Sequence, residues 1–481
     1  MNRSIIVYML GWIMNIEAVL LLLPAVTALI YGESILFCYV GVAAVCALLG
    51  FASTRKKPKT ILFFAKEGFV TVALGWLLLS FFGCMPFVIS GEIPHFIDAM
   101  FEIVSGFTTT GSSILSEVEK LSKASLMWRS FSHWIGGMGV LVFIMAVLPM
   151  TGDYNMHIMR AESPGPSVGK LVPKIRITAK LLYSIYLFMT IVMIGLLLCG
   201  QMPLFDSICM AFGTAGTGGF SCRNSGQAGY TMYQQAVISI FMLLFGVNFN
   251  VYYLLYIKKP KDAFRCEELR GYVGIVAAAI ILITINVRCM FPSLLTAFHH
   301  AVFQVATIIT TTGYSTVDFD KWPEFSKTIL LILMFVGACA GSTGGGMKVS
   351  RIMIAFKEVK KEMASLVHPR SVKVLKYEGK ALGHEVLRSL NAYIIVYAFI
   401  FVASVLVISL DNYDFTTTFS AVAANLNNIG PGLSVVGPAS NYSMLSYLSK
   451  VVLIFDMLAG RLELFPVLVL FSPGIWGKKN I

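Results

Sequence analysis

The chain has 481 residues, of which 57% are hydrophobic and only 13% are charged, and its formal net charge at pH 7 is +12. A soluble globular protein carries roughly a quarter of its residues as charged side chains. Apolar runs of about 18 or more residues recur along the whole chain, so the sequence excludes a soluble protein and predicts an all-α polytopic membrane protein.

Two apolar segments open the chain, at about 5–31 and 35–53. The first carries Asn15 and Glu17, exceeds the apolar region of a signal peptide and lacks a small-residue cleavage site before a polar continuation. We therefore expect two N-terminal transmembrane helices, within residues 1–58.

One pattern then occurs four times: an apolar span, a short amphipathic segment, a polar loop with glycine, and a second apolar span. The short segments have about ten to fourteen residues, which suits re-entrant helices. The loops read IVSGFTTTGSS, ending at Ser113, AFGTAGTGGFS, ending at Ser221, ATIITTTGYST, ending at Thr316, and ANLNNIGPGLS, ending at Ser434. The repeats are predicted at 59–160, 161–262, 263–370 and 371–481.

The eight spans of the repeats are expected in pairs. They lie at about 66–90 and 125–150, 181–200 and 233–256, 271–290 and 324–350, and 389–410 and 444–472. With the N-terminal segments, the sequence predicts ten spans and four re-entrant helices.

Basic residues are concentrated in alternate loops. Four loops carry four, five, five and nine Lys or Arg residues, whereas the loops between them carry six in total. The positive-inside rule then places the basic loops and both termini in the cytoplasm, and all four glycine loops open on the other side. The net charge therefore reflects topology, and no nucleic-acid partner is expected.

The glycine loops have the composition of a site for a dehydrated cation. Irregular polar backbone at membrane depth is costly unless it lines a cavity or is buried in protein. Backbone carbonyls can replace the water around a cation, and glycine permits the backbone geometry that points successive carbonyls at one axis. No acidic or basic residue stands at the glycines, which argues against divalent-cation and anion pores.

The four T-T-T-G-like loops, the two preceding helices and GRLE at 460–463 resemble the Trk/Ktr/HKT superfamily of potassium transporters, and within it the TrkH-type membrane subunit. The resemblance covers 60–472 and implies four M1–pore helix–M2 repeats around one pore that carries K⁺. The selectivity-filter residues that it implies are Thr109, Thr110, Gly111, Thr217, Gly218, Gly219, Thr311, Thr312, Gly313, Asn428, Ile429 and Gly430.

The filter loops differ among themselves. In the second loop, either Gly218 or Gly219 can be the filter glycine. Gly111 favours potassium, because in the plant relatives serine at this position goes with sodium permeation. The fourth loop has amides instead of threonines, so the pore is not fourfold symmetric.

The stretch GACAGSTGGGMKVSR, at 337–351, interrupts the second span of the third repeat. Five glycines in ten residues disfavour a helix, at roughly 1 kcal/mol for each. A phosphate-binding loop is disfavoured because Lys348 comes one residue late and no strand precedes it. Tight helix packing by small residues is an alternative. We favour an unwound loop below the filter, with Gly341, Gly344, Gly345, Gly346 and Lys348 as gate residues, as in the family's gating loop.

Arg461 stands inside an apolar segment, where a charge costs about 2.5 to 3.5 kcal/mol at mid-bilayer. Asp456 and Glu463 are not at the spacing of a helical ion pair with it. One interpretation is snorkelling to the interface. The resemblance favours the other, in which Arg461 belongs to the gate, faces the cavity below the filter and repels cations or pairs with the 341–346 loop.

The leading hypothesis is potassium uptake through a pore that is gated from the cytoplasm. The resemblance implies a homodimer in the bacterial cytoplasmic membrane, bound to cytosolic nucleotide-binding regulatory subunits of the TrkA type. A coupled secondary transporter is the alternative, with Asp456 and Glu463 as candidate coupling residues. No enzyme activity, metal site other than the K⁺ filter, or prosthetic group is expected, because no catalytic or metal-binding constellation is found.

Overall fold

The computed structural model describes residues 1–58, 65–139, 175–369 and 374–473. In these ranges the chain is helical except for loops and one antiparallel hairpin of β1 (Lys376–Tyr377) and β2 (Lys380–Ala381), in which Tyr377 faces Lys380. The all-α polytopic fold that the sequence predicts is therefore confirmed.

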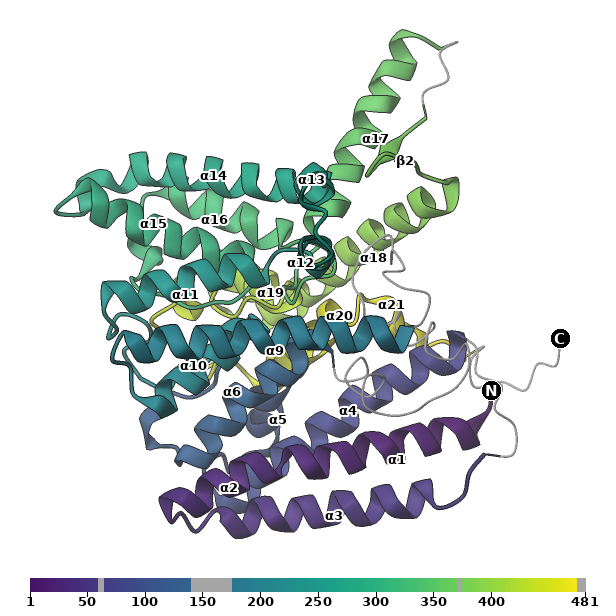
Figure 1. Ribbon diagram of the computed structural model, residues 1–481, viewed down its shortest axis with the longest axis vertical. Helices are drawn as coiled ribbons and strands as arrows, with labels where there is room; N and C mark the ends of the chain where they lie inside the picture. Colours follow the sequence, from purple (N-terminus) through teal and green to yellow (C-terminus); the bar gives the residue numbers. More distant parts are fainter. Residues whose placement is uncertain (59–64, 140–174, 370–373, 474–481) are drawn as a thin grey trace.

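The N-terminal part is a helical hairpin. Helices α1 (Arg3–Leu20) and α2 (Leu22–Tyr31) form one apolar stretch, and α3 (Leu36–Thr54) returns beside it. Figure 1 shows α1 and α3 side by side along one edge of the molecule. Both stretches are long and apolar enough to cross a membrane, as predicted.

The remaining chain contains four units of the same order. Each begins with a long apolar helix, namely α4 (Ala65–Ser90), α9 (Ile175–Cys199), α14 (Glu267–Val287) or α18 (His384–Ile408). A half-helix follows, namely α5 (Phe96–Phe107), α10 (Leu204–Gly216), α15 (Leu294–Ile309) or α19 (Phe415–Leu426). After a loop comes a second helix, namely α6 (Lys123–Met138), α11 (Met232–Phe245), α16 (Glu324–Val336) or α20 (Tyr447–Arg461).

In the described part of the chain, the second spans of the second, third and fourth units are interrupted; the sequence predicts the break in the third unit but not the bend in the second. Among the described residues, six helical stretches are long and apolar enough to span, or seven with the pair α11 and α12 (Phe249–Tyr256), which is bent by 89°. Helix α16 has 13 residues and α20 has 15 before the chain breaks. The predicted remainder of the first unit's second span, 140–150, lies outside the described residues.

The bend between α11 and α12 is stabilised by a local cap and by a loop of another unit. Asn248 caps α12 by accepting the N–H of Asn250 (2.9 Å). The backbone groups that the break leaves unpaired bond to the loop 337–348: Gly246 O accepts from Cys339 N (3.1 Å), and Phe249 N donates to Gly341 O (3.0 Å). Buried backbone groups need such partners, so the two broken helices stabilise each other.

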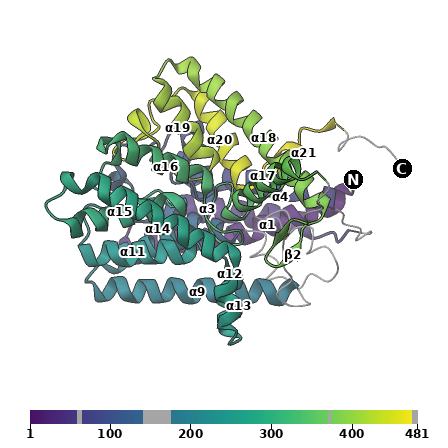
Figure 2. The same cartoon turned by 90° about the horizontal axis from the view of Figure 1, so that it is seen from above.

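The units are joined through shared cores. The largest hydrophobic cluster combines the N-terminal helices with the first and fourth units, from Ile5 to Val467. A second cluster joins residues of the third unit with Ile429 and Leu433 of the fourth. Figure 2 shows α18, α19 and α20 at one end of the molecule and α9 at the other.

Beyond the bundle, α17 (Val349–Val367) projects outward with the β1–β2 hairpin (Figure 1). Two short helices, α13 (Pro260–Arg265) and α21 (Phe465–Val469), and the single-turn helices η1 (Val118–Lys120), η2 (Arg288–Met290), η3 (Phe319–Lys321), η4 (Ser409–Asp411) and η5 (Ser434–Val436) complete the described elements.

Candidate functional site

The four half-helices end in the same backbone turn. Its left-handed residues are Thr109, Thr217, Thr311 and Asn428, with φ of 55°, 55°, 57° and 55°. The next residue bonds back into the helix: Thr110 N to Ser105 O (2.9 Å), Gly218 N to Gly213 O, Thr312 N to Thr307 O and Ile429 N to Ala424 O (2.8 Å each). Such turns commonly end helices, but with glycine at the left-handed position. A β-branched residue there is strained, which is typical of functional sites.

Each turn is followed by a glycine that is also left-handed. These are Gly111, Gly219, Gly313 and Gly430, with φ of 84°, 86°, 83° and 102°. In the second loop the equivalent glycine is therefore Gly219. Gly218 instead occupies the position of Thr110, Thr312 and Ile429.

The four loops form a closed ring. Each ring glycine packs against the next unit, at the carbonyl of the residue that precedes that unit's own ring glycine. A Cβ added to the glycine would collide with this carbonyl. These pairs are Gly111 with Gly218 O, Gly219 with Thr312 O, Gly313 with Ile429 O, and Gly430 with Thr110 O. The last pair returns to the first unit. Only glycine combines this conformation with this close approach.

The ring has a cavity on each side. A cavity of about 200 Å³ is lined by all four glycines together with polar residues such as Ser112, Asn224 and Gln227. We call this the outer side. The carboxyl ends of the half-helices meet at the ring, and helix carboxyl ends favour cations.

Threonine and asparagine side chains line the turns. Hydrogen bonds of 2.8 Å join the hydroxyls of Thr108 and Thr110, and likewise those of Thr310 and Thr312. Asn428 Nδ2 donates to Thr110 Oγ1 (3.0 Å) across the closure between the fourth and first units. The Thr109 hydroxyl is buried without a hydrogen-bond partner in the described part of the chain, so its oxygen is available to a ligand.

The loop 337–348 lies directly against the inner side of the ring. Gly345 N donates to Thr311 Oγ1 (2.6 Å), and a Cβ at Gly345 would come within 2.6 Å of Asn427 O. Gly344 is equally close-packed, since a Cβ there would lie 2.9 Å from Thr310 O. Gly341, Gly346 and Lys348 have positive φ, at 69°, 74° and 79°. The glycines thus allow an irregular segment to contact the loops of the ring on their inner side.

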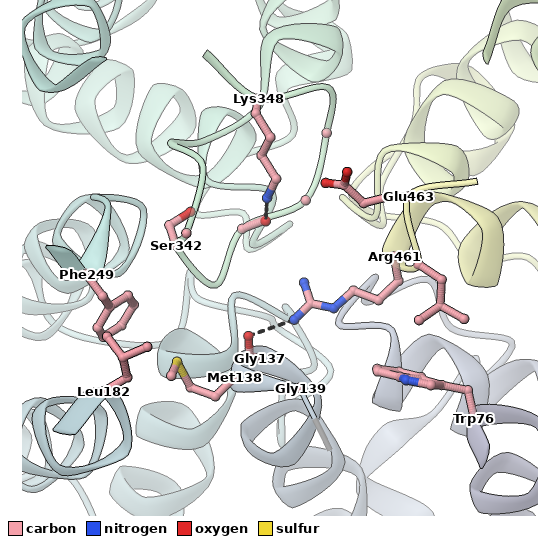
Figure 3. Close-up of a pocket in the computed structure, with 16 residues that line it drawn as sticks. Trp76, Gly137, Met138, Gly139, Leu182, Phe249, Ser342, Lys348, Arg461 and Glu463 are labelled. Atoms are coloured by element: carbon pink, nitrogen blue, oxygen red, sulfur yellow. Dashed lines mark hydrogen bonds between the residues drawn. The ribbon is translucent and has the colours of Figure 1, made fainter. Parts of the chain in front are cut away.

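Arg461, at the end of α20, connects three units. Its guanidinium donates to Thr343 O in the loop (2.9 Å), and to Gly136 O (2.5 Å) and Gly137 O (2.7 Å) at the end of α6. Figure 3 shows the side chain reaching from α20 toward Gly137, with Glu463 and Lys348 above it in the view. This inner cavity of about 70 Å³ is lined by Arg461 and the loop glycines. Arg461 is thus held by backbone carbonyls inside the protein.

The neighbouring charges are engaged elsewhere. Glu463 pairs with Arg351 at the start of α17, and Asp456 accepts a hydrogen bond from Ser404 (2.7 Å). Buried Lys348 donates to Gly344 O and so closes the loop on itself.

The sequence analysis did not find Glu268, which holds the loop from the side. Its Oε1 accepts from Ala340 N (2.6 Å) and its Oε2 from Asn248 Nδ2 (3.3 Å). Glu378 in the hairpin accepts from Glu268 N (3.0 Å). The signal available in the sequence was a carboxylate at the start of an apolar span. In the structure this side chain is 3% exposed.

Among the described residues, no group of three His, Cys, Asp or Glu side chains could hold a metal ion.

A family model described as TrkH, cation transport protein, matches residues 36–478. The chain belongs to the TrkH family. TrkH relatives include the "Trk system potassium uptake protein TrkH" of Salmonella typhimurium, 37% identical over 95% of both chains. The TrkG protein of Escherichia coli K12, also named a potassium uptake protein, is 34% identical over 99% of this chain and 100% of its own length.

The TrkH assignment agrees with a solved structure. The crystal structure of the potassium transporter TrkH from Vibrio parahaemolyticus matches with a TM-score of 0.89 and 33% identity, over 99% of this chain and 100% of that one. The likeness therefore covers the ring, the loop 337–348 and Arg461.

Proposed function

We propose that this protein is the membrane subunit of a potassium uptake system in the bacterial cytoplasmic membrane, and that K⁺ crosses the ring as through a channel. The observation that carries the proposal is the closed ring, in which each glycine packs against a carbonyl of the next unit. Relatives that are 37% and 36% identical over 95% of this chain are named potassium uptake proteins.

In this proposal the filter consists of the twelve residues from Thr109 to Gly111, Thr217 to Gly219, Thr311 to Gly313 and Asn428 to Gly430. Backbone carbonyls and threonine oxygens replace the hydration shell of K⁺. The unpartnered Thr109 hydroxyl supports this assignment.

The gate is the loop 337–348 together with Arg461. The loop blocks the exit below the ring, and Arg461 adds a positive charge there while holding the loop to α6. Opening requires breaking these hydrogen bonds and moving the loop aside.

A cytosolic regulatory subunit of the TrkA type would act through α17, which follows the gate loop directly. Its exposed apolar residues Phe356, Val359, Met363 and Leu366 are spaced along one helix face, which supports a contact with a partner or with a second copy in a homodimer.

The test is uptake of ⁸⁶Rb⁺ into K⁺-loaded proteoliposomes, with K⁺, Cs⁺ or Na⁺ as competitor. We expect strong competition by K⁺ and Cs⁺ and weak competition by Na⁺. Equal competition by Na⁺ contradicts a potassium-selective filter, and the absence of uptake contradicts a channel-like pore in the isolated subunit.

Ion-coupled symport is the second candidate. Asp456 is fully buried, and its Oδ2 has no hydrogen-bond partner among the described residues, so this carboxyl is suited to bind and release a proton. The reversal potential under voltage clamp separates the two: for a channel it follows the K⁺ gradient alone, whereas for a symporter it shifts with the pH or Na⁺ gradient.

A further inference from the structure

A buried ion pair stands behind the filter ring in the first unit. Arg129 of α6 and Glu102 of α5 are 2% and 0% exposed, and Arg129 Nη2 lies 2.7 Å from Glu102 Oε1. Arg129 Nε donates to the same oxygen at 2.8 Å. Burying two charges costs several kcal/mol per ion, which mutual attraction offsets only in part. Such a pair is weak evidence for stability and calls for another explanation.

The four units provide an internal comparison. Glu102 stands nine residues before its ring glycine, and the same position holds Met210, Gln304 and Ala421 in the other units. Arg129 stands seven residues after Ser122, the N-cap of α6. The second helices of the other units have Thr231, Pro323 and Ser446 as N-caps, and seven residues after these caps stand Ile238, Leu330 and Leu453. All six are fully buried. A unit of this fold therefore forms without the ion pair.

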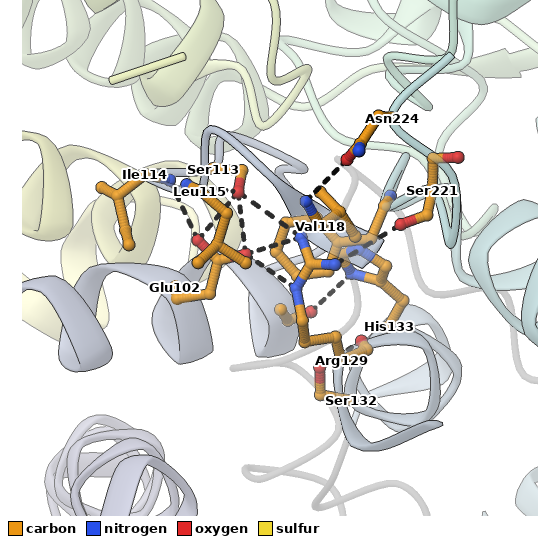
Figure 4. A network of polar contacts seen from close by, with 12 residues as sticks. Glu102, Ser113, Ile114, Leu115, Val118, Arg129, Ser132, His133, Ser221 and Asn224 are labelled. Atoms are coloured by element: carbon orange, nitrogen blue, oxygen red, sulfur yellow. Dashed lines mark hydrogen bonds and ion pairs between the residues drawn. The ribbon is translucent and has the colours of Figure 1, made fainter. Parts of the chain in front are cut away.

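The pair contacts the two filter loops nearest to it. The Glu102 carboxylate accepts from the Ser113 hydroxyl (3.0 Å) and from Ile114 N (3.0 Å), just beyond Gly111. The Arg129 guanidinium donates to Ser221 O (3.4 Å), and lies 4.0 Å from the centre of the Phe220 ring, just beyond Gly219. Figure 4 shows these contacts converging on one cluster.

His133, one helical turn after Arg129, extends the same support. Its Nδ1 lies 2.8 Å from Gly106 O in α5, and its Nε2 accepts from Phe220 N (3.3 Å). The face of α6 that carries Arg129 and His133 therefore holds the outer ends of the first and second loops together.

We propose that the Glu102–Arg129 pair is a positioning device that fixes the spacing between the first and second filter loops, and thereby sets the size of the cation accepted at the outer end of the ring. The inference rests on the proposed function. Ring carbonyls repel one another and collapse around a smaller ion unless they are held in place. Ionised hydrogen bonds to both loops resist that movement more strongly than apolar packing does.

The test transplants the second unit's residues into the first. The double variant Glu102→Met/Arg129→Ile removes both charges and leaves neither buried alone. We expect it to elute as a single peak in detergent and to take up ⁸⁶Rb⁺, with Na⁺ competing about tenfold more strongly than in the wild type. Gln304→Met in the third unit is the matched control, and we expect it to leave Na⁺ competition unchanged.

A second variant keeps the test decisive if the double variant does not fold. Ser113→Ala removes one link between the pair and the first loop without changing a buried charge, and we expect Na⁺ competition to rise about threefold. Unchanged Na⁺ competition in a folded double variant, or in Ser113→Ala, overturns the proposal. So does complete loss of ⁸⁶Rb⁺ uptake in a folded double variant, because the pair would then serve conduction itself. Absence of uptake in the wild type would instead contradict the proposed function.

Discussion

The two sides of the filter ring are organised differently. In the ring, four loops share one backbone conformation, from the left-handed turn to the glycine, although their side chains differ. On the inner side, a single loop of the third unit fills the space, held by Arg461 from the fourth unit, which also bonds to α6 of the first. Fourfold repetition is thus kept in the ring that we propose as the filter, and is lost in the loop that we propose as the gate.

The forces also differ between the two sides. The ring is fixed by steric contact between consecutive loops, so it has little freedom to move. The inner loop is held mainly by hydrogen bonds, from Arg461, Lys348, Glu268 and Thr311 and from the backbone of Phe245, Gly246 and Phe249. In the proposed gate, these hydrogen bonds have to break before the loop can move aside.

The largest effect is expected at the ring. Gly313→Ala would place a Cβ against Ile429 O at φ of 83°, so the fourth loop would have to move. We expect ⁸⁶Rb⁺ uptake to fall to background. Gly195→Ala, in α9 with nothing within 4 Å of the new Cβ, is the control and should retain wild-type uptake. Normal uptake by Gly313→Ala would refute steric closure of the ring.

Next in size is the effect of releasing the gate. Arg461→Ala removes three hydrogen bonds from a charged group to carbonyls of the loop and of α6. We expect basal ⁸⁶Rb⁺ flux without a regulatory partner to rise about tenfold or more. Exposed Arg288→Ala should not change the flux. Unchanged or lower flux in Arg461→Ala would show that this arginine does not hold the gate closed.

A smaller leak is expected from the side support of the loop. Glu268→Ala removes the acceptor of Ala340 N, one of several contacts that hold the loop. We expect basal flux to rise about threefold. Glu385→Ala, in the first turn of α18 and exposed, is the matched control. Equal flux in the two variants would mean that Glu268 serves stability alone.

The smallest effect is expected at the outer start of a half-helix. Asp414 caps α19 by accepting hydrogen bonds from the Thr417 hydroxyl and N–H, and these contacts lower the pKa of its carboxyl. Because the folded-state pKa is lowered, its stabilisation is present above the unfolded-state pKa and is lost as pH falls through the folded one.

Asp414→Ala should therefore lower stability at pH 7 by less than about 1 kcal/mol, since the group is exposed. Thermal unfolding in detergent, followed from pH 7 toward acid, should show the difference from wild type narrowing. A difference independent of pH would exclude the carboxylate as its source.

The sequence predicted the features that recur within it. The half-helices begin at Phe96, Leu204, Leu294 and Phe415, just before the four polar loops that repeat in the sequence. The number of glycines at 337–346 predicted the break after α16, because glycine destabilises a helix through its own backbone and needs no distant partner. Gly219 was ambiguous because the choice depends on which residue takes the left-handed turn, and two adjacent glycines both permit it.

The remaining features depend on contacts between units. The sequence around the bend at Asn248 has one glycine, Gly246, and no proline, so it gives little sign of a break. The bend is stabilised by the loop 337–348, which pairs with the broken backbone. Glu268, Arg129 and Glu102 were not singled out for the same reason: their partners lie in other elements, up to 92 residues away for Arg129. A single sequence does not show such pairings.

The closed ring of glycine–carbonyl contacts is built from one polypeptide. In a pore assembled from identical subunits, every mutation alters all sides of the filter at once. Here each mutation alters one side, so the four sides can diverge separately and ion preference can change in small steps. The fourth loop, with Asn–Ile–Gly where the first and third have Thr–Thr–Gly, is a side that differs from the others.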